Sequence, residues 1–92
     1  MEKEIVWTSV AQNDFWEIAE YPKAEWPEKV LNQFQKALAL KTTLLKKQPN
    51  LGFKSHKYSQ FRKTLVTRHY MLIYSVSKEH IIIHRIKHTR MR

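Results

Sequence analysis

The sequence of 92 residues contains no cysteine, one glycine and three prolines. Without cysteine the chain forms neither a disulfide framework nor a zinc site with thiolate ligands. One glycine is too few for a glycine-rich phosphate loop or a nucleophile elbow, since each needs several glycines at fixed spacing. The scarcity of glycine and proline, with 42% hydrophobic residues, is typical of a compact fold rather than a disordered chain. We therefore expect a single domain spanning residues 1–92.

Long apolar runs are also missing from the sequence. No run approaches the roughly 20 residues that a membrane-spanning helix needs. The opening residues MEKEIVW lack both the basic start and the apolar stretch of a signal peptide. The expectation is a soluble, cytoplasmic protein without a membrane partner.

Negative charge is scarce in the second half of the chain. The whole sequence has 17 Lys and Arg against 8 Asp and Glu, which gives a net charge of +9. From Lys54 onward there are ten Lys and Arg and one acidic residue, Glu79. A solvated surface usually mixes both signs, whereas a segregated basic half attracts a polyanion. The partner classes are nucleic acid, an acidic protein or an anionic membrane.

The N-terminal half has the spacing of one strand and two helices. The β-branched and aromatic stretch EIVWT (Glu4–Thr8) predicts a strand. Ser9 and Gln12 form a capping box that predicts the start of a helix, and the following proline predicts its end at or before Tyr21. A second helix is predicted from about Pro27 through EKVLNQFQKALALKTTLLKKQ.

Apolar residues in both helices recur at helical spacing, which predicts that each helix buries one stripe. In the first helix the acidic residues Asp14, Glu17 and Glu20 are assigned to a face away from the stripe of Ala11, Phe15, Ile18 and Ala19. In the second helix the stripe consists of Leu31, Phe34, Leu38 and Leu45.

Beyond the glycine the pattern changes to that of strands. Three are predicted, at Phe61–Val66, Tyr70–Val76 and Ile81–Ile86, and SKEH forms the hairpin loop between the last two. The preceding segment GFKSHKYSQ is interpreted as a basic loop. The order β-α-α-β-β-β predicts an α+β fold in which a helical hairpin packs on one face of a mostly antiparallel sheet. The other face is then open, and it is where function is sought.

This order, with four particular segments, resembles the RelE/ParE superfamily of bacterial type II toxins. The segments are VWTSVAQNDFWEIAEY, LLKKQPNLG, FRKTLVTRHYMLIYSV and IIIHRIKHTR, and the resemblance covers essentially the whole chain. In the last segment Arg85, His88 and Arg90 are similar to the ending of the ParE-like branch. The resemblance implies the toxin of a type II toxin–antitoxin (plasmid stabilization) system, which inhibits growth and is neutralised by an acidic antitoxin.

The two branches of the superfamily differ in target, and the resemblance favours one. RelE-like members cut messenger RNA on the ribosome, whereas ParE-like members poison DNA gyrase. Arg62 and Thr64 fall where RelE-like toxins carry two basic residues, and Met71 falls where they place a phosphate-binding arginine. The chain also lacks their C-terminal tyrosine and the His-Tyr ending of YoeB-like members. We therefore expect gyrase inhibition, with ribosome-dependent RNA cleavage as the alternative and a non-toxic nucleic-acid-binding module as the second.

Candidate site residues are chosen among the arginines and histidines. Arginine binds phosphate through paired donors, and histidine transfers protons near neutral pH, as metal-free RNA cleavage requires. His88 and Arg62 are the catalytic candidates; alternatively, His88 only holds the closing strand and Arg62 is a solvated edge residue. The predicted target-binding or nucleic-acid-binding residues are Arg62, Arg68, Arg85 and Arg90.

Other histidines and aromatic residues are assigned to structure. On a strand, His84 and His88 lie about 13 Å apart, too far to share one ion, so neither a metal site nor another cofactor is expected. Core positions are predicted for Tyr70 and Tyr74. Core or helix-packing positions, rather than base-stacking ones, are predicted for Trp7, Trp16 and Trp26.

Overall fold

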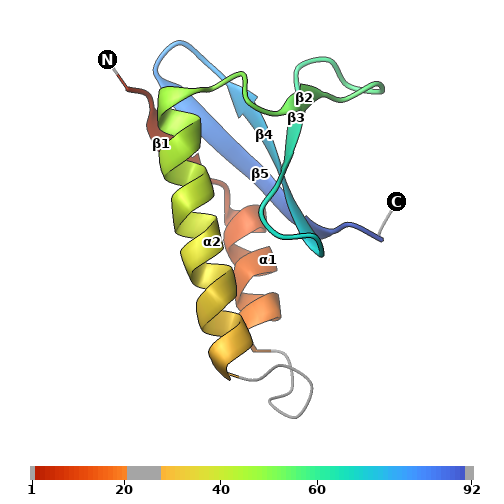
Figure 1. The fold of residues 1–92 in the computed structure, drawn as a ribbon. Helices are drawn as coiled ribbons and strands as arrows, with labels where there is room; N and C mark the ends of the chain where they lie inside the picture. The colour runs from red at the N-terminus through yellow and green to blue at the C-terminus, as the bar shows by residue number, and fades with distance from the viewer. Residues whose placement is uncertain (1, 21–27, 91–92) are drawn as a thin grey trace.

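The computed structural model describes residues 2–20 and 28–90, which form a helical hairpin on one face of a five-stranded sheet (Figure 1). The sheet order is β1-β5-β4-β3-β2, with β1 parallel to β5 and the other pairs antiparallel. The predicted α+β class and mostly antiparallel sheet are confirmed. The elements are β1 (Glu4–Trp7), α1 (Ser9–Ala19), α2 (Glu28–Lys47), β2 (Phe53–Lys54), β3 (Arg62–Leu65), β4 (Tyr70–Val76) and β5 (His80–His88).

The structure has one strand that the sequence did not predict, and several boundaries differ: β1 ends at Trp7 rather than Thr8, and β3 is Arg62–Leu65 rather than Phe61–Val66. The segment interpreted as a basic loop contains β2, which pairs with Arg62 and Lys63; a strand of two residues is too short to show a periodicity. β5 runs from His80 to His88, longer than the predicted Ile81–Ile86. The predicted start of the second helix at Pro27 lies outside the described residues.

The helix α1 is capped by Thr8 rather than by Ser9. The Thr8 hydroxyl accepts a hydrogen bond from the backbone N–H of Ala11 at 3.1 Å, as an N-cap side chain does. The same hydroxyl lies 3.1 Å from the Ile83 carbonyl oxygen, so the cap also ties the helix start to β5. The predicted capping box is therefore wrong by one residue, and the Gln12 amide donates to the Trp7 carbonyl instead.

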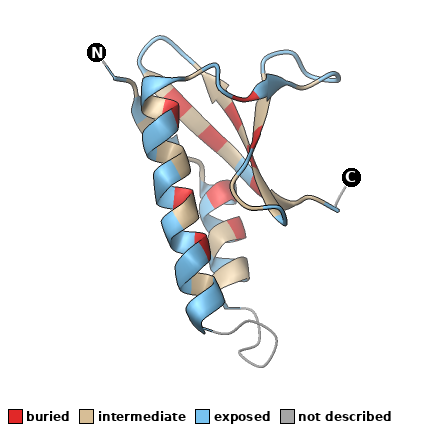
Figure 2. Ribbon diagram, in the orientation of Figure 1, coloured by how far each residue is buried: buried red, intermediate tan, exposed pale blue. Residues whose placement is uncertain are grey.

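The core lies between the helices and the sheet and draws on every large element (Figure 2). The predicted apolar stripe of α2 is confirmed, with Phe34, Leu38 and Leu45 buried and Leu31 packed against them. Tyr74 is fully buried, as predicted, and the Tyr70 ring packs 5.2 Å from that of Phe34. The buried apolar residues are Ala11, Phe34, Leu38, Leu45, Leu72, Tyr74, Ile81, Ile83 and Ile86.

A register shift between β4 and β5 changes which residues of β5 face the core. Ile73 pairs with Arg85 and Tyr74 pairs with Ile83, so His84 is an extra residue on β5. Such a bulge reverses the alternation of faces along the strand. Ile81, Ile83 and Ile86 are consequently all buried, although a regular strand would place Ile86 on the opposite face.

The tryptophans divide between core and surface. Trp7 packs against the core, as predicted, whereas 60% of Trp16 is exposed, so its predicted packing role is wrong. Trp16 follows the partly buried Phe15 on α1, and adjacent helical residues point in different directions. Trp26 lies outside the described residues.

The loop between α2 and β2 is fixed by two side chains from the sheet. The Tyr74 hydroxyl donates to the Pro49 carbonyl at 2.9 Å and accepts from the Gly52 N–H at 2.8 Å. Arg62 donates to the Gly52 carbonyl at 2.7 Å. Gly52 itself is crowded, because an added Cβ would lie 2.5 Å from the Lys63 carbonyl oxygen. Burial raises the pKa of Tyr74, which keeps its hydroxyl protonated as a donor.

Replacing Tyr74 with phenylalanine tests this loop anchor. The variant leaves the Gly52 N–H and the Pro49 carbonyl without their partner, so we expect the free energy of unfolding to fall by about 1–3 kcal/mol in urea denaturation. Tyr58→Phe, at an exposed ring, is the matched control and should change it by less than about 0.5 kcal/mol.

The raised pKa of Tyr74 adds a second expectation for the wild-type protein. Its stabilising effect is present below the unfolded-state value of 10.0 and is lost as the pH rises through the higher folded-state pKa. The free energy of unfolding of Tyr74→Phe should not show this decrease at alkaline pH. Equal free energies of unfolding of the two proteins at pH 7 would contradict the anchoring role.

Candidate anion-binding site on the open sheet face

The face of the sheet opposite the helices carries charged side chains next to apolar ones. Lys63 pairs with Ile73, Ile73 with Arg85 and Met71 with Lys87. Directly opposed residues share one face, and these alternate with the buried Leu72 and Ile86. The open face predicted from the element order therefore carries charge from β3 and β5.

A pocket of about 310 Å³ opens on this face, here called the open-face pocket. Its walls include three rings, those of Tyr58, Phe61 and His84, with Ser55 and Ile73. No carboxylate is among the described residues that line it, so the local potential is positive and attracts anions. Its cationic residues are Lys57, Lys63, Arg85 and Lys87.

His84 occupies the pocket as a neutral imidazole. Its Nε2 lies 2.8 Å from the Ser75 hydroxyl, and its ring meets the Phe61 ring edge-on at 4.9 Å. Burial lowers the pKa of His84, because desolvation disfavours the charged form. A neutral imidazole can accept a proton, so the position of His84 in the pocket makes it a candidate general base.

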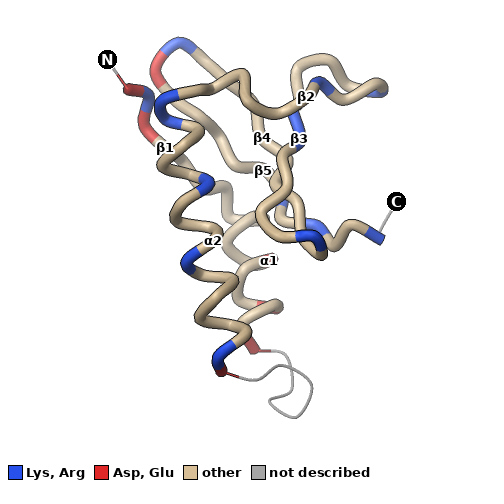
Figure 3. Tube along the Cα trace, viewed as in Figure 1, with Lys and Arg blue, Asp and Glu red and all other residues tan. Residues whose placement is uncertain are grey.

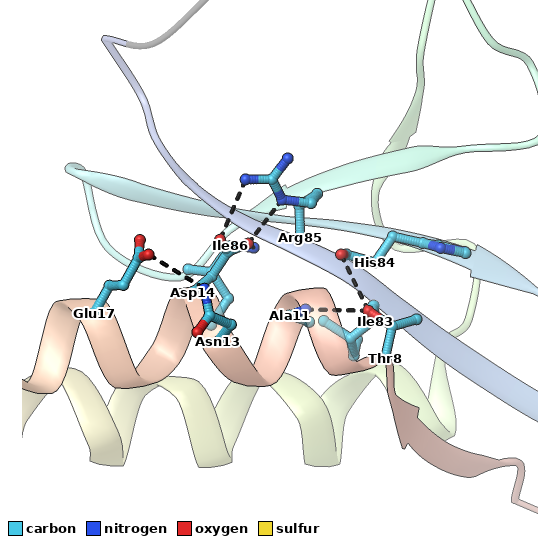
Figure 4. Close-up of polar contacts among 9 residues, drawn as sticks. All are labelled: Thr8, Ala11, Asn13, Asp14, Glu17, Ile83, His84, Arg85 and Ile86. Carbon is cyan, nitrogen blue, oxygen red and sulfur yellow. Dashed lines mark hydrogen bonds and ion pairs between the residues drawn. The ribbon is translucent and has the colours of Figure 1, made fainter.

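Arg85 is held by a carboxylate from α1 (Figure 4). Its Nε donates to Asp14 Oδ2 at 2.8 Å and its Nη2 donates to Asp14 Oδ1 at 3.2 Å. Asp14 Oδ2 also accepts the backbone N–H of Ile86 at 3.0 Å. The Asp14 side chain is 10% exposed, whereas that of Arg85 is 44% exposed. The hydrogen bonds to Asp14 raise the pKa of Arg85, so the guanidinium stays charged.

The assignment of Asp14 to an outward face of α1 is wrong. Asp14 follows Ala11 by three residues and precedes Ile18 by four, which is the spacing of a shared helical face. The carboxylate is buried because it has three donors, two from Arg85 and one from Ile86. The helical spacing therefore indicates that Asp14 lies on the buried face of α1. A charged residue on an apolar face needs a partner, however, and the sequence does not identify that partner.

The catalytic candidates Arg62 and His88 are not brought together. Arg62 pairs with Tyr74 and His88 pairs with Tyr70, four residues apart on β4, or about 13 Å. Neither lines the open-face pocket. Arg62 borders an adjoining opening and donates to the Gly52 carbonyl, while the His88 ring lies 5.3 Å from that of Tyr70 on the helix side.

Arg68 and Arg90 lie together at the end of the sheet near the C-terminus. Arg68 is in the turn between β3 and β4, and its Nε donates to His69 Nε2 at 3.3 Å. The backbone N–H of Arg90 donates to His88 Nδ1 at 3.1 Å, and the His69 and His88 rings are 5.9 Å apart. This tip of the sheet is basic (Figure 3), and neither Arg68 nor Arg90 lines the pocket.

Of the four arginines predicted to bind a target, Arg85 alone lines the open-face pocket. The sequence-based prediction missed Lys57, Lys63, Lys87 and His84. Lys63 alternates with the buried Thr64, a signal that was available in the sequence. The bulge at His84 was not visible there, so the facing of Lys87 could not be assigned from alternation alone.

The described residues contain neither a cluster of metal-ligand side chains nor a membrane-spanning helix. Within residues 2–20 and 28–90, no three or more histidine and acidic side chains gather as they would around a metal ion. None of the described helices is long and apolar enough to span a membrane.

Acidification tests the environment of His84. Its folded-state pKa lies below the unfolded value of 6.5, so the unfolded state binds more protons below that pH. The stabilising effect is present above pH 6.5 and is lost as the pH falls toward the folded-state pKa. We expect His84→Gln to flatten the fall of the unfolding free energy between pH 7 and pH 5, measured by urea denaturation. His56→Gln, at an exposed position, is the control and should leave the slope unchanged.

The chain matches the family model of the ParE toxin of type II toxin-antitoxin system, parDE, over residues 5–92. No curated protein matches it. A solved chain of the chromosomal ParDE TA system from P. aeruginosa is 23% identical with a TM-score of 0.75, and the match covers 95% of this chain and 96% of that one. The YoeB dimer from Staphylococcus aureus gives 16% identity and a TM-score of 0.68, covering 95% and 97%.

The YoeB/ParE toxin from Agrobacterium tumefaciens is 12% identical with a TM-score of 0.66, covering 92% of this chain and 96% of that chain. At these identities the solved structures establish a common fold. The match of the family model over nearly the whole chain establishes the family as well as the fold. It confirms the resemblance noted in the sequence. The chain belongs to the ParE toxin family of type II toxin–antitoxin systems.

Proposed function

We propose that this toxin arrests growth by inhibiting DNA gyrase, and that it binds its anionic target through the open-face pocket. The observation that supports the proposal is the convergence of four cationic side chains in a pocket whose described lining residues include no carboxylate. Membership of the ParE family supports gyrase over the ribosome as the target. It also favours a toxin over a non-toxic nucleic-acid-binding module.

A binding role is also supported by the positions of the two residues that sequence suggested for catalysis. Arg62 donates to backbone carbonyls of the loop after α2, and His88 lies beside Tyr70 on the helix side. Two groups that act on one bond must both reach it, whereas Arg62 on β3 and His88 on β5 lie opposite residues of β4 that are four positions apart. This separation supports separate roles for the two residues.

An acidic antitoxin would neutralise the toxin by covering the same cations. The pocket lysines, of which Lys57 is exposed and Lys63 and Lys87 are half-buried, form no ion pair with another described residue, so they are available to carboxylates of a partner. Complementary charge of this kind raises the association rate and selects the partner. A cognate antitoxin and a cytoplasmic target both fit the expected location of the protein.

Charge reversal in the pocket tests the gyrase proposal. Lys63→Glu removes one favourable charge and adds a repulsive one, so we expect the concentration that inhibits supercoiling by purified gyrase to rise at least about tenfold. Lys36→Glu makes the same change on α2, outside the lining of the open-face pocket, and should retain inhibition. Supercoiling that is unaffected by saturating wild-type toxin would overturn the proposal.

A second candidate function, ribosome-dependent RNA cleavage, is favoured by one observation. His84 is a neutral imidazole inside the cationic pocket, beside the ring of Phe61. In this reaction His84 would accept the proton of a ribose 2′-OH as its oxygen attacks the adjacent phosphorus, while Lys63 and Arg85 stabilise the charge on the phosphate. The P–O5′ bond breaks, which leaves a 2′,3′-cyclic phosphate, and the departing 5′ oxygen takes a proton from solvent. The Phe61 ring would offer a surface on which a base stacks.

Mapping new 5′ ends of the messenger in a cell-free translation reaction tests this second function. If the toxin cleaves RNA, cuts should appear only during translation, and His84→Gln should slow them by about a hundredfold or more because the proton acceptor is lost. His88→Ala, on the other face of the sheet, should leave cutting unchanged. An intact messenger removes RNA cleavage and leaves gyrase inhibition as the proposal.

A further inference from the structure

Arg85 differs from the other cations of the open-face pocket in having an internal partner. Among the described residues it is the one pocket cation that forms an ion pair, and the partner is Asp14 of α1. We infer that Asp14 is the positioning residue of the pocket, which orients the guanidinium of Arg85 for a phosphate-like oxyanion bound beside Lys63 and Lys87. This inference rests on the proposed function of the pocket as an anion-binding site.

The contact uses only part of the donor capacity of Arg85. A guanidinium has five N–H donors in a rigid fork. Asp14 accepts one from Nε and one from Nη2, which leaves both donors of Nη1 and one of Nη2. The third nitrogen projects away from Asp14 (Figure 4). The free edge of the fork can therefore give paired hydrogen bonds to a phosphate while the other edge stays on Asp14.

Asp14 is itself rigid, and this is what allows it to position another side chain. Its carboxylate is almost buried and lies on a regular helix. The backbone N–H of Ile86 donates to Oδ2 at 3.0 Å, so the carboxylate is fixed by the strand as well as by Arg85. A long arginine side chain otherwise loses rotamer freedom when an anion binds, and holding it beforehand reduces that entropic cost.

Positioning and simple electrostatics predict opposite outcomes when the charge of Asp14 is removed. Asp14 places one negative charge against a cationic pocket, so its neutralisation raises the net positive charge there. If Asp14 acted only through its charge, the variant would bind a polyanion more tightly. If it positions Arg85, the variant binds more weakly in spite of the added positive charge.

The variant Asp14→Asn tests this because it keeps an oxygen that can accept from Ile86 while removing the charge. Glu17→Gln is the matched control: Glu17 is an exposed acid one turn further along α1 that hydrogen-bonds Asn13 and influences Arg85 only through its charge. The probe is a fluorescein-labelled single-stranded oligothymidylate, and its anisotropy gives the dissociation constant at several salt concentrations.

We expect Asp14→Asn to weaken binding of the oligothymidylate about tenfold, as loss of one oriented charge-assisted contact does, while Glu17→Gln binds as tightly as wild type or more tightly. The Arg85 Nε–H resonance should be protected from solvent exchange in the wild-type protein and in Glu17→Gln, and lose that protection in Asp14→Asn. Combining Asp14→Asn with Arg85→Lys should cost no more than Arg85→Lys alone, because Asp14 acts through Arg85.

Equal or tighter binding by Asp14→Asn, or additive losses in the double variant, would overturn the inference. Arg85→Lys provides the answer if Asp14→Asn does not fold, because it keeps Asp14, the Ile86 contact and the pocket charge but removes the fork. Binding equal to wild type in that variant also overturns it. Failure of the gyrase proposal is separate: it appears as unaffected supercoiling with wild-type toxin, whereas the dependence of oligothymidylate binding on Asp14 remains.

Discussion

The contact of Asp14 with β5 joins the first helix to the last strand at the place where the sheet has no further neighbour. β1 pairs with β5 only as far as Ile83, and beyond that point the edge of β5 is covered by α1. Asp14 accepts the backbone N–H of Ile86 there and receives two donors from Arg85. A buried carboxylate is tolerable when it is hydrogen-bonded in this way, and this one connects the core to the charged face of the sheet.

The bulge at His84 determines what that charged face contains. Because His84 is an extra residue, Ile86 faces the core while His84, Arg85 and Lys87 line the open-face pocket. Other cationic residues have a structural role instead: Arg62 donates to carbonyl oxygens of the loop after α2. A high content of arginine and lysine therefore does not by itself identify the binding surface; the facing of each side chain does.

Much of the architecture follows from hydrophobic spacing, and the remaining features depend on contacts between distant parts of the chain. The stripe of Phe34, Leu38 and Leu45 and the strand around Leu72 were predictable because local periodicity reports which face is buried. The partner of Asp14 was not, since Arg85 lies 71 residues away. The set of pocket residues was only partly predictable for the same reason, because its composition depends on a register shift between two strands.

The pairing of β1 with β5 also has a consequence for synthesis. Glu4 pairs with His80 and Lys3 donates to the Ser77 carbonyl, so β1 gains its neighbouring strand only after β5 has been synthesised. Contacts between segments so distant in sequence form late and slow the folding of small domains. A nascent chain cannot complete this sheet until its last strand has left the ribosome. The charged face that carries the pocket is therefore assembled only after β5 has been synthesised, and a product truncated before β5 has no complete pocket.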